Sequence, residues 1–167
     1  ERERGITIKL APVQMRYCPE ASDTESNSFS LIENCKLKIE KLKNMSLFIV
    51  STPIGNLEDI TLRALKILKE VDVIAAEDTR HSLKLLNHYG ISKPLISYWG
   101  EKEKVKSEEI IERMETGQSV ALISDAGTPG ISDPGAVLIR RAIEEGFLVI
   151  SVPGASAITA ALSIAGL

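Results

Sequence analysis

The sequence is poor in several features, and each shortage excludes a class of protein. It holds only 2 cysteines, Cys18 and Cys35, which form neither a C-x-x-C pair nor a disulfide framework. No run approaches the roughly 18–20 apolar residues of a membrane-spanning helix. The highly charged segment 1–5 includes no apolar part of a secretory signal. These absences predict a cytoplasmic protein in a reducing compartment, with no membrane partner.

Several chemical motifs are also missing. The sequence has no G-x-G-x-x-G fingerprint, no P-loop and no G-x-S-x-G elbow, so dinucleotide enzymes, P-loop enzymes and serine hydrolases are not supported. His81 and His88 lack a third ligand at metal-binding spacing, so no metal is expected. The net charge of −3 argues against a free-standing nucleic-acid binder held by phosphate contacts alone. A cofactor without phosphates, held by backbone groups and apolar loops, fits better.

The composition changes near Met45. Residues 1–44 contain a polar run at 20–28 and one weakly amphipathic stretch at 31–42 that can form a helix. We expect 1–44 to be an irregular N-terminal extension, either poorly ordered or the product of a fusion or of a gene-calling or assembly artefact. With 44% hydrophobic residues overall, the chain can bury a core, and we place the folded domain at 45–167.

The domain alternates short apolar runs with longer segments of helical spacing. Five short runs bounded by turn residues predict buried strands, at Leu47–Val50, Val71–Ala75, Pro94–Ser97, Val120–Ile123 and Phe147–Val152. Helical spacing occurs at 60–68, 83–89 (ended by Gly90), 110–114, 137–143 and 156–164. The alternation predicts an α/β fold with a five-stranded, mainly parallel sheet flanked by helices.

Three of the predicted strands end in loops rich in Gly and Pro, at 51–56, 124–135 and 153–156. Open parallel sheets bind ligands at the carboxyl ends of their strands. Two of these loops can equally be ordinary turns between a strand and a helix. The stretch 124–135 is longer than such a turn requires and holds three Gly, two Pro and two Asp, which favours a ligand site.

Three motifs in order, at 47–57, 75–80 and 124–129, resemble the ribosomal RNA small subunit methyltransferase I family of the tetrapyrrole methylase superfamily. The resemblance runs from 45 to 167; precorrin methylases and diphthine synthases share only looser loops. It implies an S-adenosylmethionine-binding N-terminal domain. The implied reaction transfers a methyl group to the ribose 2′-hydroxyl of a cytidine in 16S rRNA of the small ribosomal subunit. A homodimer is also implied, with the cofactor in a cleft between two domains.

The resemblance assigns roles to individual residues. It implies cofactor contacts by Pro53 and Gly55 and by the central loop residues Ser124, Asp125, Ala126, Gly127 and Thr128, with Ile131 and Ser132 continuing the wall. It implies that substrate approaches the signature Glu77, Asp78, Thr79 and Arg80.

A ribose hydroxyl is a weak nucleophile and benefits from a nearby base, which Glu77, Asp78 or Asp125 can supply. Arg80 can hold an RNA phosphate. Structural interpretations stay open: Glu77 and Arg80 stand at i and i+3 and can pair, Asp78 can cap the following helix, and the two histidines can be surface residues of that helix. Trp99 can stack on RNA or pack against the protein.

Two departures from the family qualify this interpretation. The run 97–104 contains none of the histidines that the family commonly has there. Relatives continue into a second domain, so we expect part of the cofactor cleft to be absent and activity of the chain alone to be impaired. The alternative functions are a non-catalytic dimerising or binding domain of the same fold, or another methyltransferase of the superfamily.

The segment 1–17 resembles the first switch region of translational GTPases, most closely elongation factor 4. In that family the threonine matching Thr7 helps to hold magnesium. Because no P-loop precedes it and no other GTPase motif follows, a GTPase function is not supported.

Overall fold

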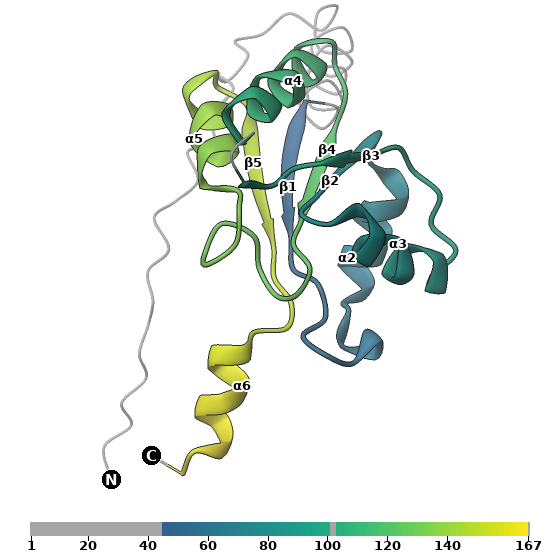
Figure 1. The fold of residues 1–167 in the computed structure, drawn as a ribbon, viewed down its shortest axis with the longest axis vertical. Coiled ribbons are helices and arrows are strands. Elements are labelled where there is room, and N and C mark those ends of the chain that lie inside the picture. Colours follow the sequence, from purple (N-terminus) through teal and green to yellow (C-terminus); the bar gives the residue numbers. More distant parts are fainter. Residues whose placement is uncertain (1–44, 101–102, 167) are drawn as a thin grey trace, which may run out of the picture. The chain divides into compact units, whose positions relative to one another are not determined.

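The computed structural model describes residues 45–100 and 103–166, which contain a five-stranded sheet with every neighbouring pair parallel (Figure 1). The spatial order is β3-β2-β4-β1-β5. The strands are β1 (Ser46–Val50), β2 (Val73–Ala76), β3 (Leu95–Ser97), β4 (Val120–Ile123) and β5 (Leu148–Val152). The predicted α/β fold is confirmed. The extension expected over 1–44, including the helix at 31–42, lies outside the described residues.

Each helix predicted within 45–167 is present, with shifted ends. The helices are α2 (Leu62–Glu70), α3 (Thr79–His88), α4 (Glu103–Glu115), α5 (Ala136–Glu144) and α6 (Ala157–Ile164), and a short 3-10 turn, η1 (Leu57–Asp59), was not predicted. Helix α2 begins after Ile60 because the Thr61 hydroxyl accepts from the Ala64 N–H at 3.1 Å and caps it. Helix α3 begins four residues before Leu83 because Asp78 caps it.

The sheet has one hydrophobic core on each face. Successive side chains of a strand point to opposite faces, so Leu47 and Ile49 of β1 join the core under α4 and α5, whereas Val50 joins the core under α2 and α3. In β4, Leu122 and Ile123 divide in the same way. Burial on both faces explains why β1 and β4 are continuous apolar runs in the sequence. Strand β5 was also predicted to be buried, but as an edge strand it is only partly buried, with Leu148 43% exposed.

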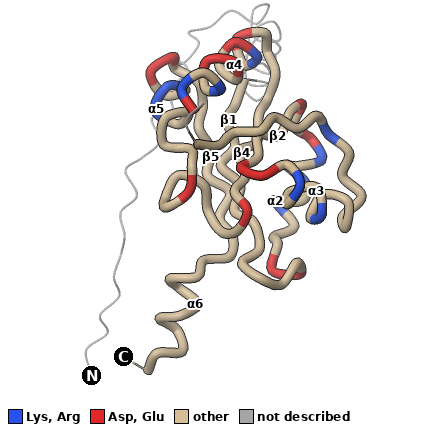
Figure 2. Tube along the Cα trace, in the orientation of Figure 1, with Lys and Arg blue, Asp and Glu red and all other residues tan. Residues whose placement is uncertain are grey.

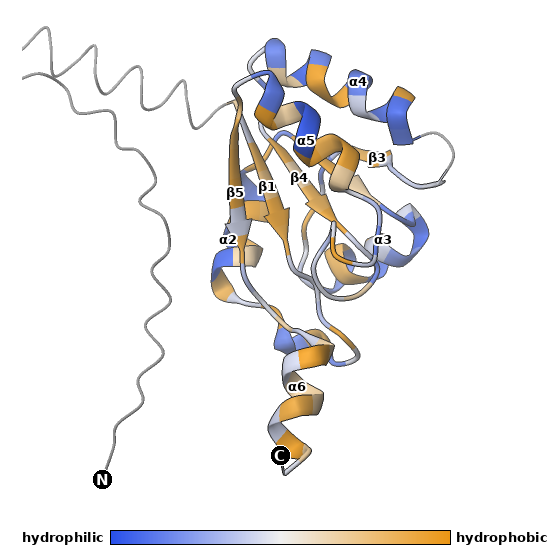
Figure 3. Ribbon diagram, turned by 90° about the vertical axis from the view of Figure 1, so that its left-hand side faces the viewer, coloured by the Kyte–Doolittle hydropathy of each residue, from blue (hydrophilic) through white to orange (hydrophobic). Residues whose placement is uncertain are grey.

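Helix α6 differs from the other helices. Its N-cap is Ser156, whose hydroxyl accepts from the Thr159 N–H at 3.4 Å, but the helix buries none of its residues. It is largely apolar (Figure 3) and carries no charged residue (Figure 2), and Ile164 is 87% exposed. Across residues 45–100 and 103–166, no helix has the length and apolar character needed to cross a membrane.

Candidate active site

The loops after β1 and β4 are joined by main-chain hydrogen bonds. The Thr52 N–H donates to Gly127 O at 2.8 Å, and the Gly127 N–H donates to Thr52 O at 3.2 Å. The Thr52 hydroxyl also donates to Ser124 O at 3.0 Å. Gly127 has a φ of +85°, a conformation that other residues adopt only with strain, so glycine suits this joint. The two loops therefore form one fixed wall.

The loop after β5 is held against the same wall. A Cβ at Gly154 would lie 2.9 Å from Ser51 Cβ, so only glycine allows the approach. The Ser51 hydroxyl is in turn 2.7 Å from the hydroxyl of Thr128 in the loop after β4. The three loops that the sequence singled out thus meet at the carboxyl edge of the sheet, where parallel sheets bind ligands.

One pocket of about 410 Å³ lies between this wall and α3, and we call it the loop pocket. Its lining includes five of the predicted cofactor residues, namely Pro53, Gly55, Ser124, Asp125 and Ala126. Ile54, Leu57 and Leu85 give it apolar surface. The pocket offers apolar contact and main-chain groups together with the polar side chains of His81, Lys84 and Asp125, and a cofactor without phosphates stays a prediction for it.

Two buried serine hydroxyls belong to the lining of the loop pocket. Ser82 and Ser124 are 3% and 2% exposed, and neither hydroxyl has a hydrogen-bond partner among the described residues. Buried polar groups are nearly always hydrogen-bonded, and among the described residues only Gln118 Oε1, which lines neither pocket, is in the same condition. The sequence pattern did not identify Ser82; its only signal is its place one turn into α3, after the 77–80 motif.

A second pocket, of about 610 Å³, adjoins the first across Asp125, which lines both. We call it the acidic pocket, because Glu77, Asp78 and Asp125 contribute carboxylates and Arg80 is its one described cationic side chain. The other lining residues are Thr79, Ser97, Trp99, Gly100 and Pro134. The predicted substrate residues and the central loop therefore share one site.

Glu77 and Asp125 are tied to each other's loops. The Asp125 N–H donates to Glu77 Oε2 at 3.3 Å, and the Asp78 N–H donates to Asp125 Oδ1 at 3.3 Å. Partial burial raises the pKa of Glu77 above its ordinary value, and the nearby carboxylates of Asp125, Asp133 and Asp78 raise it further, against the opposing bond from the Asp125 N–H. A general base works best when its pKa lies near the working pH, so a raised pKa makes the Glu77 carboxylate a better base.

Asp78 and Arg80 form a separate unit. Asp78 Oδ1 accepts from the Arg80 N–H at 2.8 Å, which caps α3, and the Arg80 guanidinium donates to Asp78 Oδ2 at 2.9 Å. These bonds lower the pKa of Asp78 to about 2. The capping interpretation is confirmed, and the Glu77–Arg80 pair is wrong because Arg80 turns to Asp78 instead. His81 and His88 are exposed on α3, as expected.

Four predicted cofactor residues lie outside the loop pocket. Gly127 and Thr128 join loops instead of lining the pocket. Ile131 is 71% exposed, Ser132 is also exposed, and neither lines either pocket. Among the residues that the structure describes, no cluster of three or more His, Cys, Asp or Glu side chains is arranged to hold a metal ion.

Residues 46–167 match the sequence profile of the Tetrapyrrole (Corrin/Porphyrin) Methylases. The chain belongs to this family, as the fold and the loops at the carboxyl edge also indicate. Among solved structures it is similar to a cobalt precorrin-4 methyltransferase (TM-score 0.60, 25% identity, covering 74% of this chain and 52% of that one). It shares its fold with a diphthine synthase (TM-score 0.58, 21% identity, covering 73% and 49%).

Curated relatives indicate a more specific group within this family. They confirm the expected similarity to ribosomal RNA small subunit methyltransferase I. The chain is 54% identical over 121 residues to the protein of that name from Pasteurella multocida, covering 72% of this chain and 43% of the relative. It is 53% identical over 120 residues to the one from Thermotoga maritima, covering 72% and 54%. The chain thus spans about half the length of these relatives.

Proposed function

We propose that this chain carries the cofactor-binding part of an S-adenosylmethionine-dependent methyltransferase that acts on the ribose 2′-hydroxyl of a cytidine in 16S rRNA. The observation that carries the proposal is the 54% identity over 121 residues to a ribosomal RNA small subunit methyltransferase I. The proposal includes the small ribosomal subunit as partner, a homodimer and a cytoplasmic location.

The loop pocket is where we place the cofactor. When bound, S-adenosylmethionine supplies a methyl group on a positively charged sulfur. Pro53, Ile54 and Leu85 offer apolar contact, and the hydroxyls of Ser82 and Ser124 line the pocket without a hydrogen-bond partner among the described residues, so they are the groups we expect to bond a polar ligand. Asp125 lines this pocket and the acidic one, so its negative charge favours a cation at their boundary.

We assign the proton-accepting role to Glu77. Its pKa is raised and it lines the acidic pocket beside Asp125, so it can take the hydroxyl proton as the ribose oxygen attacks. Asp78 is a poorer base because Arg80 occupies both of its oxygens and lowers its pKa. Arg80 has an 89% exposed side chain, which leaves it able to contact an RNA phosphate.

The test is methyl transfer from radiolabelled S-adenosylmethionine to small ribosomal subunits lacking the modification. The proposal expects label in 16S rRNA, on a cytidine whose 3′ phosphodiester resists alkaline hydrolysis because its 2′-oxygen is methylated. Label on a base or on another RNA contradicts the substrate assignment. Subunits already methylated at the site are the matched control and accept no label.

A second candidate is a non-catalytic binding domain of the same fold. The observation that favours it is α6, an apolar helix that buries none of its residues and so offers a surface for association. It predicts a stable dimer in sedimentation, with no S-adenosylmethionine bound in equilibrium dialysis. Saturable cofactor binding contradicts it.

A further inference from the structure

Trp99 is the only tryptophan of the chain, and it is 64% exposed on the lining of the acidic pocket. A tryptophan usually buries most of its large apolar surface. Of the two interpretations that the sequence left open, packing against the protein is therefore wrong for the described residues. The exposed indole needs another explanation.

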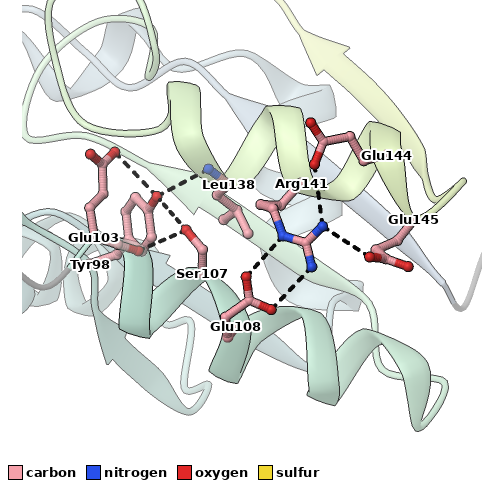
Figure 4. Close-up of polar contacts among 8 residues, drawn as sticks. All are labelled: Tyr98, Glu103, Ser107, Glu108, Leu138, Arg141, Glu144 and Glu145. Atoms are coloured by element: carbon pink, nitrogen blue, oxygen red, sulfur yellow. Dashed lines mark hydrogen bonds and ion pairs between the residues drawn. The ribbon is translucent and has the colours of Figure 1, made fainter.

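The main chain that presents Trp99 is well anchored. Ser97 pairs with Ala76 at the end of β3, and the next residue, Tyr98, continues the pairing with an N–H bond to Ala76 O of 2.8 Å. The Tyr98 side chain is fully buried, and its hydroxyl accepts from the Leu138 N–H at 3.2 Å (Figure 4). Trp99 thus follows a fixed residue directly, which reduces the entropy lost when a ligand binds to it.

The Tyr98 hydroxyl also contacts side chains of α4. It donates to Glu103 Oε1 at 3.2 Å and lies 3.0 Å from the Ser107 hydroxyl, and Glu103 Oε1 also accepts from the Gly135 N–H at 2.8 Å. The anchor of Trp99 therefore also holds the end of the central loop. The position of Trp99 and that of the loop 124–135 therefore both depend on the hydrogen bonds of Tyr98 and Glu103.

Two carboxylates that line the acidic pocket with Trp99 each have one oxygen without a hydrogen bond from a described residue. Glu77 uses Oε2 for the Asp125 N–H, and Asp125 uses Oδ1 for the Asp78 N–H, whereas Glu77 Oε1 and Asp125 Oδ2 accept none from any described residue. Carboxylates accept hydrogen bonds from the exocyclic amino groups of bases such as cytosine. They repel a phosphate, so the pocket suits a base better than the RNA backbone.

We propose that Trp99 is a stacking platform for one amino-bearing nucleobase of the RNA, which sits in the acidic pocket and donates to Asp125, while Glu77 keeps its proton-accepting role. The pocket of about 610 Å³ has the size of a small-ligand site. The backbone phosphate stays at the rim, where Arg80 is exposed. This inference rests on the proposed function and adds to it a base contact and a preference among bases.

The single tryptophan allows a direct test on the chain itself. Pentacytidylate and pentauridylate RNA are titrated while Trp99 emission is recorded, and fluorescein-labelled versions report binding by anisotropy. We expect both to quench Trp99, with pentacytidylate binding about 5-fold tighter or more because uracil lacks the amino group. Trp99→Ala weakens RNA binding about 5- to 100-fold, and Trp99→Phe restores part of it. Leu62→Ala, at an exposed apolar position of α2, is the control and changes nothing.

Each other outcome overturns a stated part. Equal RNA affinity of Trp99→Ala and the parent removes the platform but leaves RNA binding, and with it the proposed function, intact. Equal affinity for the two RNAs removes the amino-group contact. No RNA binding by the parent overturns both the inference and the proposed RNA substrate. Emission of RNA-free protein that changes with protein concentration shows that a second copy covers Trp99.

Discussion

The α4–α5 layer and the carboxyl edge of the sheet treat their polar groups in opposite ways. In the layer, the buried Tyr98 hydroxyl has three partners, and the Arg141 guanidinium pairs with Glu108, Glu144 and Glu145 (Figure 4). At the edge, the buried hydroxyls of Ser82 and Ser124 have no partner among the described residues. The Tyr98 hydroxyl and the Arg141 guanidinium therefore have all their hydrogen-bonding partners within the protein, whereas the two serine hydroxyls at the edge do not; Gln118 Oε1, just after α4, is the other buried side-chain atom without a partner among the described residues.

This difference separates stability from function. A satisfied buried network rigidifies the fold, whereas a buried polar group without a partner costs free energy of folding. Perturbed and unsatisfied groups gather where a ligand is to be bound or a proton moved. We therefore expect substitutions in the layer to reduce stability, and substitutions at the edge to reduce binding or catalysis while leaving stability unchanged or raising it.

The largest effect is expected for Glu77→Gln. Without a base, the rate constant of methyl transfer falls about 100- to 10,000-fold. The pKa of Glu77 is higher in the folded protein than in the unfolded chain, so the carboxylate opposes folding once the pH exceeds its ordinary value of 4.5. Gln removes that charge, and urea unfolding at pH 7 should show equal or greater stability.

The control for Glu77→Gln is Glu112→Gln. Glu112 is exposed on α4 and lines neither the loop pocket nor the acidic pocket. This substitution should change neither rate nor stability. If Glu77→Gln unfolds more easily than the parent at pH 7 and retains its rate, Glu77 is a structural residue and the comparison between the two regions fails.

Tyr98→Phe should have the largest effect on stability. It leaves the buried Leu138 N–H without its acceptor, which costs about 1–3 kcal/mol of the free energy of unfolding, whereas the Ser107 hydroxyl keeps its 2.7 Å bond to Glu103 O. Burial raises the pKa of Tyr98 to about 12, so the folded state holds a proton that the unfolded state loses. The stability from this group is present below pH 10 and is lost between about pH 10 and 12.

Urea unfolding of the Tyr98→Phe variant and the parent between pH 7 and 12 checks both parts. The difference between the two proteins should shrink as the pH rises through this window. A constant difference contradicts the assigned pKa, and no difference at pH 7 contradicts the stabilising role of the network.

Asp78→Asn should have a smaller, pH-dependent effect. Asn retains the capping oxygen but loses the charge that pairs with Arg80. The lowered pKa of Asp78 means that its contribution is present above pH 3.8 and is lost as the pH falls towards about 2. Thermal unfolding between pH 2 and 6 should show the parent losing its advantage over Asp78→Asn in that window, and an advantage that is unchanged at pH 2 contradicts the pair.

Arg141→Ala should have the smallest effect. The guanidinium joins α4 to α5 through Glu108, but its partners are exposed, and such pairs contribute little. We expect a smaller loss of stability than in Tyr98→Phe, and one that disappears at 1 M salt, where the screening length is only about 3 Å. A loss that persists at high salt indicates packing by the side chain instead of charge.

Much of the fold could be predicted from the sequence because local patterns determine it. Strands buried on both faces had to be short apolar runs, and Gly90 with its φ of +62° marked the end of α3. The strand order β3-β2-β4-β1-β5 could not be predicted, because crossover helices of similar length allow several orders.

The site was predictable only in part, because local sequence patterns show unusual loops but do not show which side chains meet in the fold. The loops at 51–56 and 124–135 were visible as unusual composition, and their resemblance to a family gave them roles. That Arg80 pairs with Asp78 and not with Glu77 depends on side-chain directions, which spacing does not determine. Ser82 looks like any polar residue of a helix until the fold buries it beside the loop pocket.

The measurement that tests the central claim most directly is a titration of ¹⁵N-labelled chain with S-adenosylmethionine, followed by amide chemical shifts. The account predicts shifts concentrated at 51–56, 77–82 and 124–128, with α4 and α5 unchanged. Shifts centred instead on the pocket of Val105, Val137 and Arg140 between α4 and α5, or no shifts at saturating cofactor, would contradict it.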